Sequence, residues 1–228
     1  MNAKAPELRS RAIAVKGAAY WLGMALAITL ASTAFSETST KAHCLPNIDL
    51  FAVALPMFQH FTSEHLKGNL GALWVVTIWG LSCGVRPSDA LAWLAITALL
   101  NLWQAFPAKM SCIYGLSGVV YGAAAIASLR LIKEPSSNRG GFSVYSQASR
   151  LTILLKILGA VVLCAELIFL LLSSSQLVTG RREPFDGHIS IEVDFATHWI
   201  GFGLGCIFAM LGNYFPKNKS LSATYDTS

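Results

Sequence analysis

Charged side chains are scarce in this sequence. Asp, Glu, Lys and Arg make up 13% of its 228 residues, whereas hydrophobic residues make up 54% and the mean hydropathy is +0.54. Soluble domains carry about 25% charged residues, so this composition argues against a water-soluble globular protein. Charge is also scarce locally, because several stretches of roughly 18 residues or more are almost free of it, and that length crosses a bilayer as a helix.

Six stretches have this character and predict an all-α membrane protein with six transmembrane helices in a single domain. Lipid offers no water to unpaired backbone groups, so each stretch must be helical. The predicted spans are residues 17–35, 68–85, 90–107, 111–129, 151–173 and 195–214, with short tails at 1–16 and 216–228. Another interpretation of the first stretch stays open, because basic residues before an apolar run and small residues after it also fit a cleavable signal peptide.

The sequence also lacks any Cys-x-x-Cys pair, which argues against a structural zinc site. Cys83, Cys164 and Cys206 fall within or at the ends of spans, where we interpret them as small packing residues. Cys44 and Cys112 fall outside the spans, and a disulfide between them stays open for an oxidising compartment. There is no internal repeat, which argues against a transporter.

The positive charge is distributed unevenly along the chain. If the N-terminus is cytoplasmic, the inner segments hold 11 of the 17 Lys and Arg residues and the outer segments hold 5, with Lys156 inside a span. This split obeys the positive-inside rule. The basic pI therefore reflects orientation, and no basic run interleaved with aromatics indicates nucleic-acid binding.

Three connecting segments have recognisable character. The outer segment 44–61 is too short and too interrupted by proline to cross the membrane, and we expect it to lie in the interface or against the bundle. The polar outer segment 176–194 is expected to act as a movable cap, and the inner segment 134–147 to be a flexible connector.

Polar residues inside spans are costly and call for an explanation. Ser117 stands at the outer end of the fourth stretch, before Gly118 and Gly122, and His198 starts the sixth stretch, before Gly201 and Gly205. One interpretation is structural, with glycines packing helices and the serine bonding back to a carbonyl. The other is that two glycine-bearing helices approach closely and bring the hydroxyl and the imidazole into hydrogen-bonding range.

The charge-derived orientation places further polar groups in the same layer. The second, fourth and sixth stretches all run inward, and the segment around the start of the second holds His60, His65 and Asn69. His65 and Asn69 are four residues apart and share one helix face. A serine nucleophile needs a base within about 3 Å and donors for the oxyanion. We predict Ser117 and His198 as a catalytic dyad, an oxyanion hole made of His65, Asn69 and the Ser117 backbone N–H, and Tyr121 as a residue that positions the imidazole.

These motifs resemble the rhomboid family of intramembrane serine proteases. The matching segments are His-x-x-x-Asn at His65 and Asn69, Gly-x-Ser-Gly at Gly115 to Gly118, and His-x-x-Gly-x-x-x-Gly at His198, Gly201 and Gly205. The resemblance extends from about residue 51 to residue 211, and it implies a rhomboid-like six-helix bundle with its core at about 51–215 and a water-filled cavity open to the outer side. It departs from the family in the first outer loop, where Phe51-Ala52 stands in place of the frequent Trp-Arg.

The resemblance implies an endopeptidase that cleaves transmembrane segments of other membrane proteins near the outer face, without metal or cofactor, in a bacterial inner membrane. The rival expectation is an inactive rhomboid-like protein that binds or chaperones membrane clients. Glu166 falls well below the predicted catalytic layer, so we expect a protonated or hydrogen-bonded contact within the bundle. Lys156 is expected to extend toward the cytoplasmic surface.

Overall fold

The structure is a computed structural model that describes residues 4–35, 56–58, 60, 63–105, 115–133, 147–174 and 195–212. These residues contain helices and no strand, which confirms the all-α prediction. The elements are α1 (Lys4–Phe35), the 3₁₀ turn η2 (Pro56–Phe58), α3 (Ser63–Cys83), α4 (Pro87–Ala105), α5 (Ser117–Lys133), α6 (Gln147–Ser174) and α7 (Phe195–Leu211). Cys44, Cys112, most of segment 44–61, the whole of 176–194, nearly all of 134–147 and the C-terminal tail lie outside the described residues.

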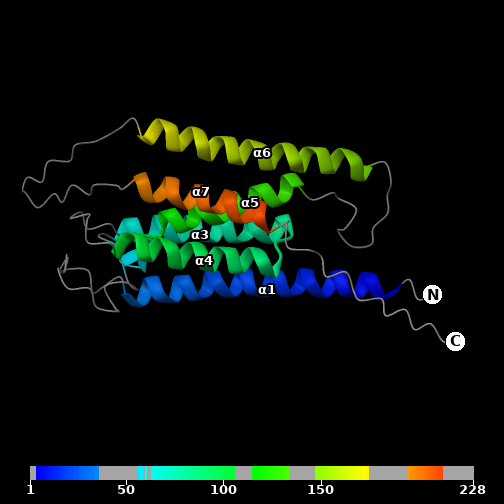
Figure 1. The fold of residues 1–228 in the computed structure, drawn as a ribbon, viewed down its shortest axis with the longest axis horizontal. Helices are drawn as coiled ribbons and strands as arrows, with labels where there is room; N and C mark the ends of the chain where they lie inside the picture. The colour runs from blue at the N-terminus through cyan, green and yellow to red at the C-terminus, as the bar shows by residue number, and fades with distance from the viewer. Residues whose placement is uncertain are drawn as a thin grey trace, which may run out of the picture.

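The helices lie side by side along one long axis (Figure 1). α5 is central, since it contacts α3, α4, α6 and α7, and its contact with α7 is the most extensive in the molecule. α1 packs on α3 and α4, and α6 covers the other side of the bundle (Figure 1). The two predicted catalytic residues are therefore carried by the most closely packed pair of helices.

The turn between α3 and α4 follows from its local sequence. Gly84 has φ +71°, the left-handed conformation that favours glycine. The Gly84 and Val85 N–H groups donate to the Leu81 and Gly80 carbonyls, which caps the end of α3. Pro87 then occupies the first position of α4, where its missing N–H costs nothing.

A tryptophan pair anchors α1 to the bundle. The Trp21 and Trp93 rings are fully buried, with centroids 4.3 Å apart, and the Trp21 indole lies against Gly80 of α3. A side chain at position 80 would occupy the space of this indole. Near the other end of α4, the Asn101 amide nitrogen contacts Met57 Sδ at 2.6 Å and ties η2 to the bundle.

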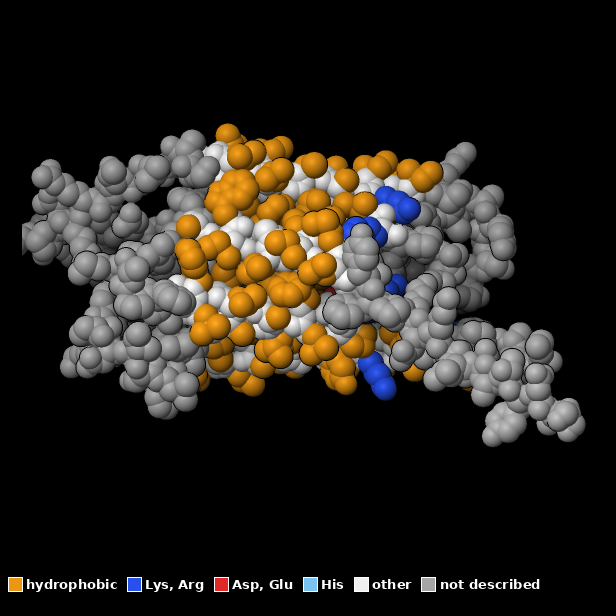
Figure 2. Space-filling model, viewed as in Figure 1, with side chains coloured by type: hydrophobic (Ala, Val, Ile, Leu, Met, Phe, Trp, Pro, Cys, Tyr) orange, Lys and Arg blue, Asp and Glu red, His pale blue; other side chains and the backbone are white. Residues whose placement is uncertain are grey.

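The outer surface of the bundle is apolar. Large hydrophobic side chains are strongly exposed on α1, α3, α4, α6 and α7, among them Leu30, Val75, Leu91, Leu154 and Leu172 at 62–68% exposure. In Figure 2 hydrophobic side chains form a belt across the middle of the visible face, and Lys and Arg gather toward one end. So many exposed hydrophobic side chains would favour aggregation of a soluble monomer, whereas the apolar interior of a lipid bilayer would accommodate them.

Two described stretches, Arg11–Phe35 and Ile153–Leu172, are long and apolar enough to cross a membrane. α5 and α7 have 17 residues each within the described part of the chain, and α7 contains a shorter apolar stretch, Ala196–Leu211. Two span candidates support membrane association. Among the described residues, helix length and hydropathy support two of the six predicted spans.

The bundle has two distinct ends. The first residues of α3, α5 and α7 lie together at one end, which we call the serine end because it holds Ser117 (Figure 1). Arg86 and Asp89, at the turn into α4, and Arg130, in the last turn of α5, lie at the opposite end, which we call the arginine end. Parallel α3, α5 and α7 therefore place the predicted site residues at one level of the bundle.

Candidate active site

The structure brings Ser117 and His198 together. Ser117 Oγ and His198 Nε2 are 2.6 Å apart, although the residues are 81 positions apart in the sequence. His198 is only 7% exposed, while Ser117, at the first position of α5, is half-buried. A short contact between a hydroxyl and an imidazole nitrogen is the geometry that general-base activation of serine requires.

Glycines on both helices create this proximity. A Cβ at Gly201 would overlap the Gly118 carbonyl, and one at Gly205 would lie 2.9 Å from Gly122 Cα. A Cβ at Gly122 would in turn lie 2.9 Å from the Gly201 carbonyl oxygen. The backbones of α5 and α7 are therefore in direct contact over two turns, as expected from the spacing of the glycines.

Thr197 belongs to the same helix contact, although sequence reasoning did not select it. Its side chain is buried, and a Cβ at Gly118 would lie 2.7 Å from both its methyl group and its carbonyl oxygen. Thr197, Gly201 and Gly205 recur every four residues, which is the spacing of one helix face. This run of small residues is the pattern that could have identified Thr197.

Tyr121 lies next to the imidazole. Its ring centroid is 5.0 Å from that of His198, with the planes inclined by 35°. On the α6 side, the Tyr121 ring stacks on Phe169 with centroids 6.4 Å apart. The phenol ring thus separates the His198 imidazole from α6, and the contact limits rotation of the imidazole.

His65 and Asn69 lie beside the backbone that leads into Ser117. Gly115 has φ +122°, and a Cβ on it would lie 3.0 Å from His65 Cε1 and 3.3 Å from Asn69 Nδ2. Asn69 is 8% exposed, and its amide nitrogen has no hydrogen-bond acceptor among the described residues. A buried amide donor without an acceptor is costly, so this group is available to an incoming oxygen.

The start of α5 adds backbone donors to the same place. The Val119 and Val120 N–H groups donate to the Leu116 carbonyl, which makes Leu116 the residue that caps the helix. The N–H of Ser117 then occupies a position that has no acceptor within a helix. The positive end of the α5 dipole also favours negative charge at this point.

His60 is a further buried histidine beside the site, and its position in the sequence alone indicates no role. Its ring is 3% exposed and stands edge-on to the His65 ring, with centroids 5.1 Å apart. Burial, together with the neighbouring charge of His65, lowers the pKa of His60 to about 4, against a smaller opposing effect of its hydrogen bond to Phe58. Because a carbonyl can only accept, His60 Nδ1 donates to the Phe58 oxygen at 3.1 Å, which leaves Nε2 unprotonated.

Comparison with known proteins identifies no relative. No family model matches the chain, and no curated protein or solved structure matches it either. The geometry of the site is therefore the basis for assigning a function. The rhomboid resemblance remains an interpretation of the three motifs.

The other predicted residues lie on α3, α6 and α7. Glu166, on α6, is half-buried, and its Oε2 atom has no hydrogen-bond partner among the described residues. Among the described residues, Cys83, Cys164 and Cys206 form no disulfide, and of these only Cys83 is fully buried. Lys156 is half-buried in the first half of α6.

Proposed function

We propose that this protein is an intramembrane serine endopeptidase of the rhomboid type, with Ser117 as nucleophile and His198 as general base. The observation that carries the proposal is the 2.6 Å contact between Ser117 Oγ and His198 Nε2. A serine hydroxyl is a weak nucleophile until a base removes its proton, and a neutral imidazole is suited to this at physiological pH. Tyr121 takes the orienting role that a carboxylate has in a triad.

The reaction proceeds as acyl transfer in two halves. Ser117 Oγ attacks the scissile carbonyl carbon while its proton passes to His198 Nε2, and the imidazolium then protonates the leaving amine. In the second half, water gives a proton to His198 and attacks the acyl-enzyme carbonyl, and Ser117 leaves with the proton restored. Two-step acyl transfer of this kind is complete with serine, histidine and water.

The oxyanion of each tetrahedral intermediate would lie between α5 and α3. The Asn69 amide, the His65 ring and the Ser117 N–H are the donors on that side of Ser117, and Gly115 allows the chain to pass close to both α3 side chains. Removing one preorganised donor of this kind typically costs 100-fold to 1000-fold in kcat. The absence of a side chain at Gly115 is what leaves room for the substrate oxygen.

The proposal includes six membrane spans, with the N-terminus and the arginine end on the cytoplasmic side. The exposed leucines and isoleucines around the bundle support a lipid environment (Figure 2). Arg86, Arg130 and Lys133 lie at the end opposite Ser117, and under the positive-inside rule this distribution supports a dyad near the outer face.

The substrates would be transmembrane segments of other proteins. Helices hold their carbonyls in hydrogen bonds, so the scissile region must unwind before Ser117 can reach it. Segments with glycine, proline or small residues near the outer face unwind at lowest cost and are the expected substrates.

The test is cleavage of a panel of model transmembrane substrates in proteoliposomes by wild-type protein and by Ser117→Ala. The expected result is product from the wild type and none above background from the variant. Equal turnover by both proteins would exclude Ser117 as nucleophile. Absence of cleavage across the panel by folded wild-type protein would favour a client-binding role.

A further inference from the structure

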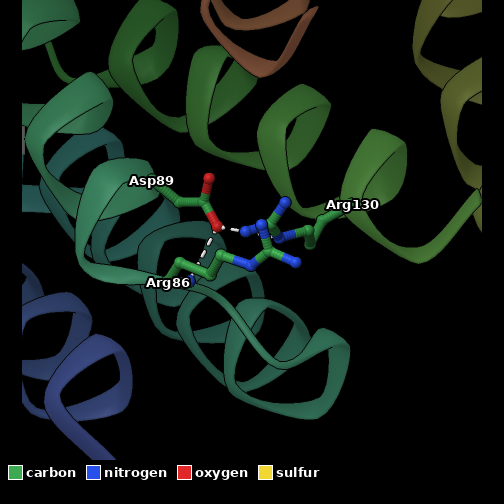
Figure 3. Close-up of polar contacts among 3 residues, drawn as sticks. All are labelled: Arg86, Asp89 and Arg130. Atoms are coloured by element: carbon green, nitrogen blue, oxygen red, sulfur yellow. Dashed lines mark hydrogen bonds and ion pairs between the residues drawn. The ribbon is translucent and has the colours of Figure 1, made fainter. Parts of the chain in front are cut away.

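Glu166 is an acidic residue within the bundle that the proposed chemistry does not use. Another acidic residue, Asp89, is compensated, since its Oδ2 accepts a hydrogen bond from the Arg86 backbone N–H at 2.7 Å and lies 3.1 Å from Arg130 Nε (Figure 3). Glu166 Oε2 is also buried, but it has no hydrogen-bond partner in the described part of the chain. A buried carboxyl oxygen without a donor is costly, so a donor from another molecule would stabilise it.

The face of α6 that packs on the bundle carries Glu166. Leu163, Glu166 and Leu170 follow one another at intervals of three and four residues, and the two leucines belong to an apolar cluster with residues of α5 and α7. The Glu166 carboxyl group is close enough to the Tyr121 hydroxyl on α5 and the Cys206 thiol on α7 to act on both electrostatically. Glu166 therefore faces the place where α5, α6 and α7 meet.

The basic residues at the inner ends of α5 and α6 do not compensate Glu166. Lys156 is ten positions before Glu166, about 15 Å along the helix, which exceeds the combined reach of the two side chains. Lys133, in the last turn of α5, acts electrostatically on Cys206, but it forms no ion pair with Glu166. The carboxyl group thus has no cationic partner among the side chains that the structure places.

Glu166 can be reached from the surrounding lipid. It is half-buried, and its neighbours Leu167 and Ile168 on α6 are 39% and 55% exposed. α6 packs mainly on α5 and much less on α7. On α7, Ile207 is 49% exposed next to Cys206. A transmembrane segment that approaches α6 and α7 from the bilayer would therefore lie beside the carboxyl group.

The chemistry of this position favours a basic side chain as the partner. Ionisable residues within a membrane pair with one another, because lipid solvates neither charge. A metal ion needs several ligands, and no group of three or more His, Cys, Asp and Glu residues suited to one occurs within the described ranges. A transmembrane segment with a Lys or Arg supplies a cation together with apolar surface for Leu167 and Ile168.

The depth of Glu166 determines which part of a substrate it would meet. Tyr121 is four residues inward of Ser117, about 6 Å along α5. Phe169 stacks on Tyr121, and Glu166 is three residues before Phe169, about 4.5 Å further inward because α6 runs antiparallel to α5. Glu166 therefore lies about 10 Å inward of the nucleophile, which is the length of about seven helical residues.

We propose that Glu166 is a specificity residue, which pairs with a Lys or Arg in the transmembrane segment of the substrate, about seven residues inward of the bond that is cut. This inference rests on the proposed function, which identifies the bound segment as a substrate. Glu166 acts on the binding of the segment and touches none of the reacting atoms.

The test measures the Kd of a transmembrane peptide for full-length Ser117→Ala protein in phosphatidylcholine nanodiscs, so that the peptide stays intact. The parent peptide is a fluorescent Leu-rich segment with Gly-Pro near its outer end. One Leu is replaced by Lys at successive positions, or by Met or Asn as uncharged matches. The protein is compared with the double variants that add Glu166→Gln or Glu64→Gln, the latter a control that removes a carboxyl group from an exposed residue at the serine end.

We expect Glu166→Gln to weaken binding of the Lys peptide about tenfold, the usual effect of losing a hydrogen bond to a charged group. The loss should be greatest for Lys about seven residues inward of Gly-Pro, and the Met peptide should bind all three proteins equally. Equal Kd values of the Lys peptide with and without Glu166→Gln, or the same loss with Glu64→Gln, would overturn the proposal. An equal gain for Asn and Lys peptides would overturn the choice of a basic partner.

Crosslinking is a second measurement, which needs no change at Glu166. Dicyclohexylcarbodiimide activates a carboxyl group in an apolar environment, and a nearby amine then forms an amide as dicyclohexylurea leaves. We expect the Lys peptide to become joined to Glu166 of the Ser117→Ala protein. Attachment to a different acidic residue would contradict the pairing.

The specificity role and the proposed protease activity fail separately. Tighter binding of the Lys peptide requires no catalysis, so it would persist in a protein that cuts nothing and would then support pairing of Glu166 with a bound client. Cleavage of Lys and Met substrates by the wild type with equal kcat/KM would remove the specificity role and leave the dyad in place.

Discussion

Replacing Gly201 with alanine should separate the dyad while leaving most of the bundle folded. A Cβ at this position would overlap the Gly118 carbonyl oxygen and lie 2.6 Å from its carbon. Carbon atoms in contact prefer a separation of roughly 3.5–4.0 Å, so α5 and α7 must move apart by about 1 Å. Added to the 2.6 Å between Ser117 Oγ and His198 Nε2, this exceeds hydrogen-bonding range.

The expected magnitude follows from this displacement. A misplacement of about 1 Å in an active site lowers the rate by about 100-fold, so we expect kcat/KM of Gly201→Ala to fall by at least that factor. Overpacking of this kind costs about 1–3 kcal/mol of stability, which leaves a folded protein. The assay is cleavage of a model transmembrane substrate, with circular dichroism to verify helical content.

Gly203→Ala is the matched control on the same helix. A Cβ at Gly203 has nothing within 4 Å, so the change should leave kcat/KM close to wild type. Alanine is also the better helix residue, by about 0.5–1 kcal/mol. Near wild-type activity in Gly201→Ala, or an equal loss in Gly203→Ala, would refute the argument that backbone contact between α5 and α7 sets the dyad distance.

Other predictions concern backbone strain, pH and packing. Gly115→Ala should lower the free energy of unfolding by about 1–3 kcal/mol, because φ is +122° at this position. It should also abolish cleavage, because the new Cβ would displace the His65 and Asn69 side chains that serve as oxyanion donors. Retained cleavage by this variant would contradict the prediction. Since the pKa of His60 is about 4 when folded and 6.5 when unfolded, stability should be full above pH 6.5 and fall by about 3 kcal/mol toward pH 4. Thermal denaturation across that range should show a steeper slope in wild type than in His60→Gln, where the remaining slope comes from other groups such as His65, whose pKa burial also lowers. Gly80→Ala should lower the free energy of unfolding by about 1–3 kcal/mol, because its Cβ would lie 2.5 Å from Trp21 Cε2. Gly71→Ala is the control, because a Cβ there has nothing within 4 Å and should not lower stability. Equal melting temperatures for the two variants would exclude tight packing between Gly80 and Trp21.

Helical periodicity explains how much of the site can be inferred from the sequence. The glycines that follow Ser117 and His198 recur at helical spacing, so one face of each helix could be identified without coordinates. The apolar stretches of the sequence predict the positions of the helices. Length and hydropathy alone do not place the shorter helices in a membrane. The 2.6 Å contact then follows from the close approach that these glycines permit.

Other features depend on tertiary packing and have no local signature. The position of Gly115 against His65 and Asn69 depends on how α3 packs beside the chain entering α5. The pairing of Arg130 with Asp89 joins residues 41 positions apart, and counting charges for orientation revealed neither its geometry nor its burial. Contacts of this kind require coordinates, because sequence spacing constrains only neighbours along one helix.

The most direct measurement of the central claim is labelling by a fluorophosphonate probe, followed by mapping of the modified residue. The probe reacts with serines that a base has activated. We predict modification of Ser117 in the wild type, none in Ser117→Ala, a strongly reduced rate in His198→Ala, and wild-type labelling in Ser82→Ala, a change at the arginine end of α3. Modification of a different serine, or an unchanged rate at Ser117 without His198, would contradict a dyad formed by these two residues.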